Sequence, residues 1–198
     1  MRSEDKYFDQ LTSEELWKRY CGFLDLDVRS FMAIQRELLL DQVDRVWSST
    51  LGKAIIGQEK PRTIDEFRRL VPLTTYDDYA SYLEEKREDA LAFKPGFWCH
   101  SSGRMGEFKW FPHSPEFLEH ANKACISIAA LASTSERGKI NFAPGFRMLL
   151  VLPPAPYMSG AMIDSMAEHI TFRSIPPRET VSTLPFQQQV AAGFQIAL

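Results

Sequence analysis

The spacing of apolar residues changes character near residue 90. Before that point, apolar residues recur at intervals of three and four, as on the buried face of an amphipathic helix. Thr12 and Thr63 are each followed three residues later by glutamate, a capping box that starts a helix. The spacing also predicts a longer helix over residues 27–49. We therefore expect residues 1–90 to form a mainly helical region packed on the body of the protein.

Glycines and tyrosines mark the rest of this helical region. Gly52 and Gly57 interrupt the apolar spacing, and a polar stretch up to Arg62 follows them, which predicts a loop. Thr75 caps a further helix, on which tyrosines recur at every third residue. Because such a stripe is typical of a packed helix face, we interpret it as packing rather than as a binding surface.

Beyond residue 90, short apolar segments alternate with helical ones. Strands are predicted over residues 97–99, 108–111, 148–152 and 172–175. Helices are predicted to start at Ser114, Ser159 and Pro185. Strands that alternate with helices indicate an α/β fold, so residues 91–198 are expected to hold part of a mixed or parallel sheet with flanking helices.

Three of these segments carry more specific expectations. The continuous apolar run 148–152 is typical of a strand buried on both faces. The helix that starts at Ser114 is expected to bury five apolar residues, namely Phe117, Ala121, Ala124, Ile128 and Leu131. The last helix is still helical in pattern at Leu198, without a glycine cap, and we interpret the chain as a fragment or a truncated gene product.

Composition narrows the class of protein. With 25% charged residues, a net charge of −3 and no lysine–arginine block, the chain does not have the basic surface that nucleic-acid binding requires. The three cysteines are too widely spaced for a disulfide framework or a zinc site, and Cys99, His100 and His113 lack metal-ligand spacing. The charged N-terminus is no signal peptide, and the apolar runs are too short to span a membrane. We expect a cytoplasmic protein without membrane, nucleic-acid or metal partners.

The most distinctive stretch is the segment between the first two predicted strands. It contains two hydroxyls, two glycines and two cations, namely Ser101, Ser102, Gly103, Arg104, Gly106 and Lys109. Glycines let the backbone approach a phosphate closely, while hydroxyls, N–H groups and an ammonium bind its oxygens. The spacing is not that of a Walker A loop. From the residues alone, a plain hairpin with a glycine turn and a nucleotide-binding loop both remain possible.

The spacing of this segment resembles the phosphate loop of the acyl-adenylate-forming superfamily, whose usual pattern is Ser/Thr-Ser-Gly-Thr-Thr-Gly-x-Pro-Lys. Five residues match it position by position: Ser101, Ser102, Gly103, Gly106 and Lys109. Arg104, Met105 and Phe108 depart from it, and the pattern's two threonine hydroxyls are lost. Residues 67–79 are similar to the segment upstream of this loop in the auxin-responsive acyl-acid–amido synthetases and in phenylacetate–CoA ligase. The N-terminal helices resemble those of the auxin-responsive branch.

A later segment also resembles these enzymes. Residues 152–160 are similar to the stretch that follows a core strand and places an aromatic residue beside the acyl pocket, which implies substrate contacts for Tyr157, Ser159 and Gly160. An exposed proline-rich turn is the alternative for this segment. The resemblance covers the front part of the family's architecture and implies an incomplete adenylation domain. The adenine-binding segment and the C-terminal lid are not found within the 198 residues.

The resemblance implies a specific reaction. The enzyme to which this segment belongs would use ATP, with Mg²⁺ in the substrate complex, to convert a small carboxylic acid into an acyl-adenylate, and would pass the acyl group to an amine or a thiol. The residues that carry catalysis remain unassigned. The alternatives are a truncated, non-catalytic module that binds a nucleotide, a missing C-terminal segment or another copy of the chain, and a helical interaction protein whose glycine loop is only a turn.

Overall fold

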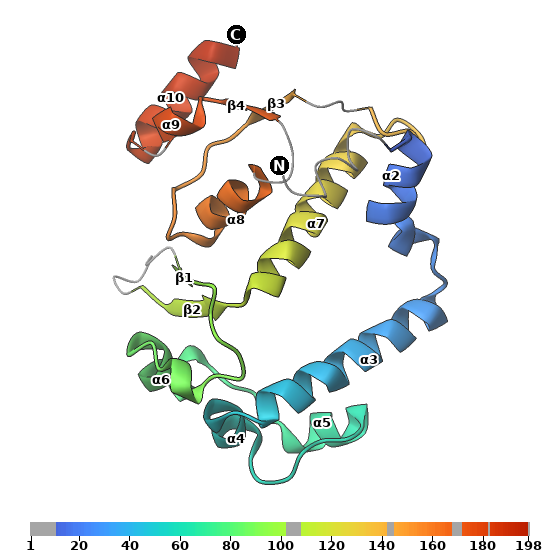
Figure 1. Ribbon diagram of the computed structural model, residues 1–198, viewed down its shortest axis with the longest axis vertical. Helices are drawn as coiled ribbons and strands as arrows, with labels where there is room; N and C mark the ends of the chain where they lie inside the picture. The colour runs from blue at the N-terminus through green and yellow to red at the C-terminus, as the bar shows by residue number, and fades with distance from the viewer. Residues whose placement is uncertain (1–10, 102–107, 142–144, 168–171, 182, 198) are drawn as a thin grey trace. The chain divides into compact units, whose positions relative to one another are not determined.

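A computed structural model describes residues 11–101, 108–141, 145–167, 172–181 and 183–197 (Figure 1). The chain forms two compact units. We call Asp25–Pro115 the hairpin unit. The described residues up to Leu24, together with those from Glu116 onward, form the split unit. Helices predominate, and the strands of the described residues form one antiparallel and one parallel pair, which confirms the mixed α/β class.

The hairpin unit contains a series of helices followed by a β-hairpin. Its helices are α3 (Val28–Trp47), α4 (Thr50–Ile56), α5 (Ile64–Leu70), η2 (Tyr76–Asp78), α6 (Ala80–Glu84) and η3 (Glu88–Ala90). The predicted long helix is confirmed as α3, where the Asp27 carboxylate accepts the N–H of Ser30 at 2.7 Å. The start of α5 is also confirmed, because the Thr63 hydroxyl accepts the N–H of Glu66 at 3.1 Å.

The loop predicted after α3 is wrong over its first part, where α4 forms. Ser49 is its N-cap and accepts the N–H of Gly52 at 2.9 Å, and Gly57 ends it with a φ of 93°. Gly52 is buried, and a Cβ there would lie 1.7 Å from the carbonyl oxygen of Val46. This glycine therefore permits a close approach of α4 to the end of α3, rather than interrupting a helix.

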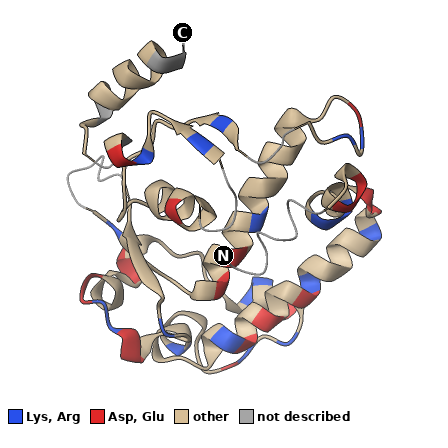
Figure 2. Ribbon diagram, turned by 45° about the horizontal axis from the view of Figure 1, so that its top comes forward, with Lys and Arg blue, Asp and Glu red and all other residues tan. Residues whose placement is uncertain are grey.

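Most of the surface of α3 is exposed. Among its residues, all of which lie in the described part of the chain, Val43 is buried, whereas Phe31, Ile34 and Leu38 are exposed. Acidic and basic residues both occur along the helix (Figure 2). The packing of the helical region on the body of the protein stays a prediction.

The hairpin consists of β1 (Phe97–His100) and β2 (Trp110–His113), paired antiparallel with Cys99 opposite Phe111. The two predicted aromatic strands are thus confirmed, although β2 begins two residues later than expected. Because side chains alternate along a strand, Trp98 and Trp110 lie on one face of the hairpin, and Cys99 and Phe111 on the other.

The split unit brings an N-terminal helix together with the second half of the chain. Its elements are α2 (Ser13–Tyr20), followed by η1 (Gly22–Asp25), and then α7 (Pro115–Ser133), β3 (Phe146–Leu149), α8 (Met158–Ala167), β4 (Phe172–Ile175), α9 (Arg178–Val181) and α10 (Phe186–Ala197). The capping box at Thr12 is confirmed, with hydrogen bonds in both directions between Thr12 and Glu15. The sequence did not predict the short helix α9.

The parallel sheet pairs β3 with β4, and Phe146 lies opposite Phe172. The prediction of a strand over 148–152 buried on both faces is wrong in extent and in burial. Phe146 and Met148 pack against the core, but Leu149, on the other face, is 51% exposed. Burial alternates along β3 because, among the described residues, only one face of the β3–β4 sheet packs on the core. The apolar residues that follow β3, Leu150 and Leu152, line a small pocket instead.

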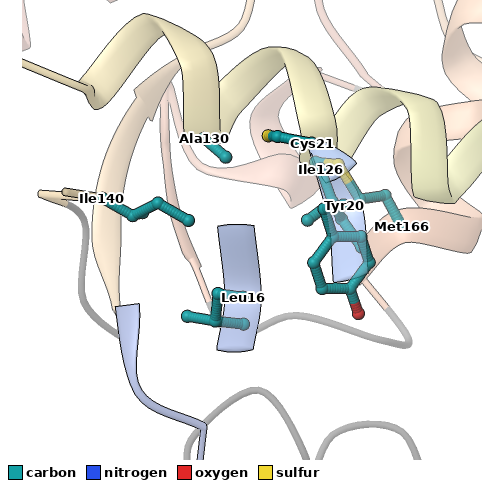
Figure 3. Close-up of a cluster of buried hydrophobic side chains, with 7 residues drawn as sticks. All are labelled: Leu16, Tyr20, Cys21, Ile126, Ala130, Ile140 and Met166. Atoms are coloured by element: carbon teal, nitrogen blue, oxygen red, sulfur yellow. The ribbon is translucent and has the colours of Figure 1, made fainter. Parts of the chain in front are cut away.

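The core of the split unit lies between α2 and α7 (Figure 3). Its buried residues are Leu16, Tyr20, Cys21, Ile126, Ala130, Ile140 and Met166. The buried face predicted for α7 is therefore wrong, because Ile128 is 66% exposed whereas Ile126 is 4% exposed. The buried stripe also contains Asn122, whose amide donates to the Ser165 hydroxyl at 2.8 Å, a partner 43 residues away.

Among the described helices, none combines the length and the apolar character needed to cross a membrane.

Candidate functional site

The two ends of the predicted phosphate loop pair with each other at the end of the hairpin where the loop connects β1 to β2. The Ser101 N–H donates to the Lys109 carbonyl at 2.9 Å, and the Lys109 N–H donates to the Ser101 hydroxyl at 3.1 Å. Four further residues of the predicted site, Ser102, Gly103, Arg104 and Gly106, lie outside the described residues. Lys109 therefore lies at the end of the loop, where the hairpin fixes its backbone and leaves its side chain exposed.

Tyr76 supports this end of the hairpin from the side of Cys99 and Phe111. Its hydroxyl accepts the N–H of Trp110 at 3.0 Å, and its ring centroid lies 5.1 Å from the Lys109 ammonium nitrogen. Its ring also meets that of Phe111 edge-on at 5.6 Å. Burial raises the pKa of Tyr76, so its hydroxyl remains protonated at neutral pH. The sequence had assigned Tyr76 only to a packing stripe.

Lys86 occupies the opposite face of the hairpin. Its ammonium nitrogen lies 3.7 Å from the ring centroid of Trp110 and 5.8 Å from that of Trp98. Its φ of 50° is in the left-handed region, which a residue with a side chain rarely adopts. The turn after α6 thus holds a second cation against the hairpin, and the sequence showed only a lysine within a run of charges.

Two side chains of β1 next to the loop have structural roles. Cys99 is 1% exposed, and burial raises the pKa of its thiol, which suits a buried core residue and not a nucleophile. His100 packs against Phe108 with ring centroids 4.2 Å apart, and its Nδ1 lies 2.8 Å from the Ser101 carbonyl oxygen. His100 therefore anchors the residue at which the loop begins.

His113, at the far end of β2, makes the stability of the hairpin unit dependent on pH. It stacks on Phe97, and burial lowers its pKa below the ordinary value of 6.5. The unfolded chain consequently binds a proton at a higher pH than the folded one, so this contribution to stability is complete above about pH 6.5 and is lost as the pH falls toward the lowered pKa.

We expect the urea midpoint of unfolding to decrease between pH 7 and pH 5, and His113→Gln to reduce that decrease. Unfolding followed by circular dichroism at several pH values measures it. His120→Gln, at an exposed histidine, is the matched control and should leave the slope as in the parent. Equal slopes for His113→Gln and the parent chain contradict the assignment to His113.

The three residues predicted to contact a substrate lie at the start of α8 in the split unit. Tyr157 and Ser159 are half-buried. Gly160 is buried, and a Cβ there would lie 2.4 Å from backbone atoms of Pro154 and Ala155. Gly160 is therefore a position of close backbone packing, which lets the proline-rich turn cross the first turn of α8.

A small pocket of about 50 Å³ lies beside this turn. Its wall is mostly apolar, formed by Leu150, Leu152, Pro153, Pro154, Gly160 and Ile163. Asp164 and Arg178, which also line it, form an ion pair at 2.5 Å. Sequence reasoning identified neither member of this pair, because they lie on different helices. No group of three or more histidine, cysteine, aspartate or glutamate side chains suited to a metal ion occurs within the described part of the chain.

The chain matches a model of a known protein family. The family model described as the GH3 family N-terminal domain matches residues 22–190, which includes the whole hairpin unit and most of the split unit. No curated protein and no solved structure matches the chain.

Proposed function

Because the chain belongs to the GH3 family, which includes the auxin-responsive acyl-acid amido synthetases of the adenylate-forming superfamily, we propose that it is the N-terminal segment of an enzyme that activates a carboxylic acid with Mg-ATP. The segment from Ser101 to Lys109 is the proposed phosphate loop. Family membership supports the class of enzyme, and the loop residues support the place at which the nucleotide binds.

The proposed reaction has two steps. In the first, a carboxylate oxygen attacks the α-phosphorus of ATP, the bond from that phosphorus to the oxygen bridging to the β-phosphorus breaks, and pyrophosphate leaves. In the second, an amine or thiol forms a bond to the carbonyl carbon of the acyl-adenylate and loses its proton to the solvent, and AMP leaves with the electron pair of the broken C–O bond. Negative charge develops on the phosphoryl oxygens in the first step, so a fixed cation and N–H donors beside them lower the barrier.

The observation that carries this proposal is the pairing of Ser101 with Lys109 at the ends of the loop. It closes the loop through two hydrogen bonds and keeps the ammonium of Lys109 on the exposed end of the hairpin. The Ser101 hydroxyl accepts the Lys109 N–H and keeps its own proton for donation to a phosphate oxygen. Arg104 supplies a second cation in place of the threonine hydroxyls, and Tyr157 is proposed to line the acyl pocket.

Lys109→Ala tests the proposal most directly. Mg-ATP should slow hydrogen exchange of the amides between Ser101 and Lys109 in the parent chain, because bound phosphate oxygens accept their N–H groups. Loss of a charge-assisted hydrogen bond should weaken Mg-ATP binding about ten- to a hundredfold. At a concentration near the parent dissociation constant, protection should therefore disappear in Lys109→Ala.

Lys94→Ala provides the control, since Lys94 is an exposed lysine of the same unit outside the loop. It should retain the protection seen in the parent chain. If Mg-ATP protects none of these amides in the parent, the chain does not bind nucleotide here, and the interpretation as a protein-binding module replaces the proposal. Equal protection in Lys109→Ala and the parent would remove Lys109 from its role.

A further inference from the structure

The hydroxyl of Tyr76 makes two contacts with the backbone of one residue on β2. It accepts the N–H of Trp110 at 3.0 Å and donates to the Trp110 carbonyl at 3.4 Å. Tyr76 is 9% exposed, and the two residues lie 34 positions apart in the sequence. A single buried side chain thus ties η2 to the residue that follows Lys109.

The pairing pattern of the hairpin explains why these two groups are available. In an antiparallel pair, residues whose N–H and C=O groups point toward the partner strand alternate with residues whose groups point outward. The Ser101 N–H bonds to the Lys109 carbonyl across the hairpin, so the backbone groups of the next residue, Trp110, point to the outer edge of β2. Tyr76 pairs with both of them, which caps an edge strand at the end nearest the loop.

The ring of Tyr76 also contacts β2, in addition to the two hydrogen bonds of its hydroxyl. Lys109 and Phe111 are two residues apart on β2 and share a face, and the Tyr76 ring approaches both. A lysine side chain has much rotamer freedom to lose when it binds a phosphate. An ammonium that already lies 5.1 Å from an aromatic centroid loses less of that freedom, because its average position is set before the ligand arrives.

From these contacts we propose that Tyr76 is the positioning residue of Lys109. Its hydroxyl fixes the backbone of β2 beside Lys109, and its ring holds the Lys109 ammonium at the start of β2. Tyr76 itself does not touch the nucleotide. This inference rests on the proposed function, since it assumes that Lys109 binds a phosphate of ATP.

Two substitutions separate the hydroxyl from the ring. Tyr76→Phe keeps the ring and removes both hydrogen bonds, so without ligand the Trp110 amide should exchange faster than in the parent chain. The dissociation constant of Mg-ATP, measured by calorimetry, should rise about three- to tenfold. Tyr76→Leu also removes the ring and should raise it further. Tyr79→Phe is the matched control, because it removes a neighbouring hydroxyl for which the structure records no bond to β2, and it should change neither measurement.

A double-mutant cycle distinguishes positioning from a general structural role. If Tyr76 acts through Lys109, Tyr76→Leu should change Mg-ATP affinity by less than about twofold when Lys109→Ala is already present. If Tyr76 only stabilises the fold, the same fold-change appears with and without Lys109, and the inference is wrong. Should Tyr76→Leu fail to fold, Tyr76→Phe preserves the buried ring and is used in the cycle in its place.

The remaining outcomes separate this inference from the proposed function. A parent chain that does not bind Mg-ATP overturns the proposed function and the role of Tyr76 together. A parent chain that binds Mg-ATP, with unchanged affinity in Tyr76→Phe and Tyr76→Leu, leaves the proposed function intact and overturns the positioning role alone.

Discussion

Gly52→Ala should destabilise the hairpin unit by about 3 kcal/mol, as expected when a rigid contact is overpacked. The new Cβ would lie 1.7 Å from the carbonyl oxygen of Val46 and 2.4 Å from its carbonyl carbon, and both are backbone atoms that cannot rotate away. Moving α4 outward would also disturb Ser49, whose hydroxyl accepts the Gly52 N–H and donates to the Val46 carbonyl. Urea unfolding followed by circular dichroism measures the loss.

Gly22→Ala is the matched control for this experiment. A Cβ at Gly22 meets no atom within 4 Å, so the same chemical change fits there without displacement. Since alanine restricts the unfolded chain more than glycine does, stability should be unchanged or higher by up to about 1 kcal/mol. Equal effects of the two substitutions would show that α4 does not approach the end of α3 as closely as described.

Ile126→Ala should destabilise the split unit by about 2–5 kcal/mol, whereas Ile128→Ala should change its stability by less than about 0.5 kcal/mol. Both isoleucines lie on α7, and the same atoms are removed in each case. Ile126 is 4% exposed and lies in the core with Leu16 and Met166, whereas Ile128 is 66% exposed. The difference arises from the cavity and from the loss of apolar burial at Ile126.

Thermal unfolding of the two variants in parallel gives the measurement, with the parent chain as reference. The comparison needs no absolute free energy, because the two substitutions are chemically identical and differ only in the face of the helix. A larger loss for Ile128→Ala than for Ile126→Ala would reverse the assignment of the buried face of α7 and restore the one that the apolar spacing predicted.

The sequence predicted those features whose causes are local. The capping boxes and caps at Thr12 and Thr63 depend on residues three positions away, and the structure confirms both helix starts. The aromatic strands of the hairpin also depend on neighbouring residues, apart from the two-residue shift of β2. The family match likewise confirms the family resemblance. The sequence could show this resemblance because it rested on residues within one short stretch and on the segments that flank it.

Features that depend on distant partners were missed. The apolar residues of α7 occur on more than one face of the helix, so their spacing could not identify which face is buried. The buried face is the one that also carries Asn122, which contacts Ser165 on another helix. A glycine can either interrupt a helix or permit close packing, and the sequence alone does not distinguish the two roles. At Gly52 the nearby Val46 carbonyl, seen only in the structure, shows that the role is close packing. At the candidate site, the loop was predicted from sequence, but the support from Tyr76 was not, since its partner lies 34 residues away.

The two contacts at Trp110 and Lys109 imply an order in which the hairpin unit folds. The Lys109–Ser101 bond closes a stretch of 8 residues, whereas the Trp110–Tyr76 bond closes one of 34. Each doubling of a loop adds about 0.6 kcal/mol of closure entropy, so the longer closure costs about 1.2 kcal/mol more. The hairpin can therefore form early from its own residues and dock on Tyr76 afterwards. The two ends of the loop therefore pair before Tyr76 bonds to the Trp110 backbone.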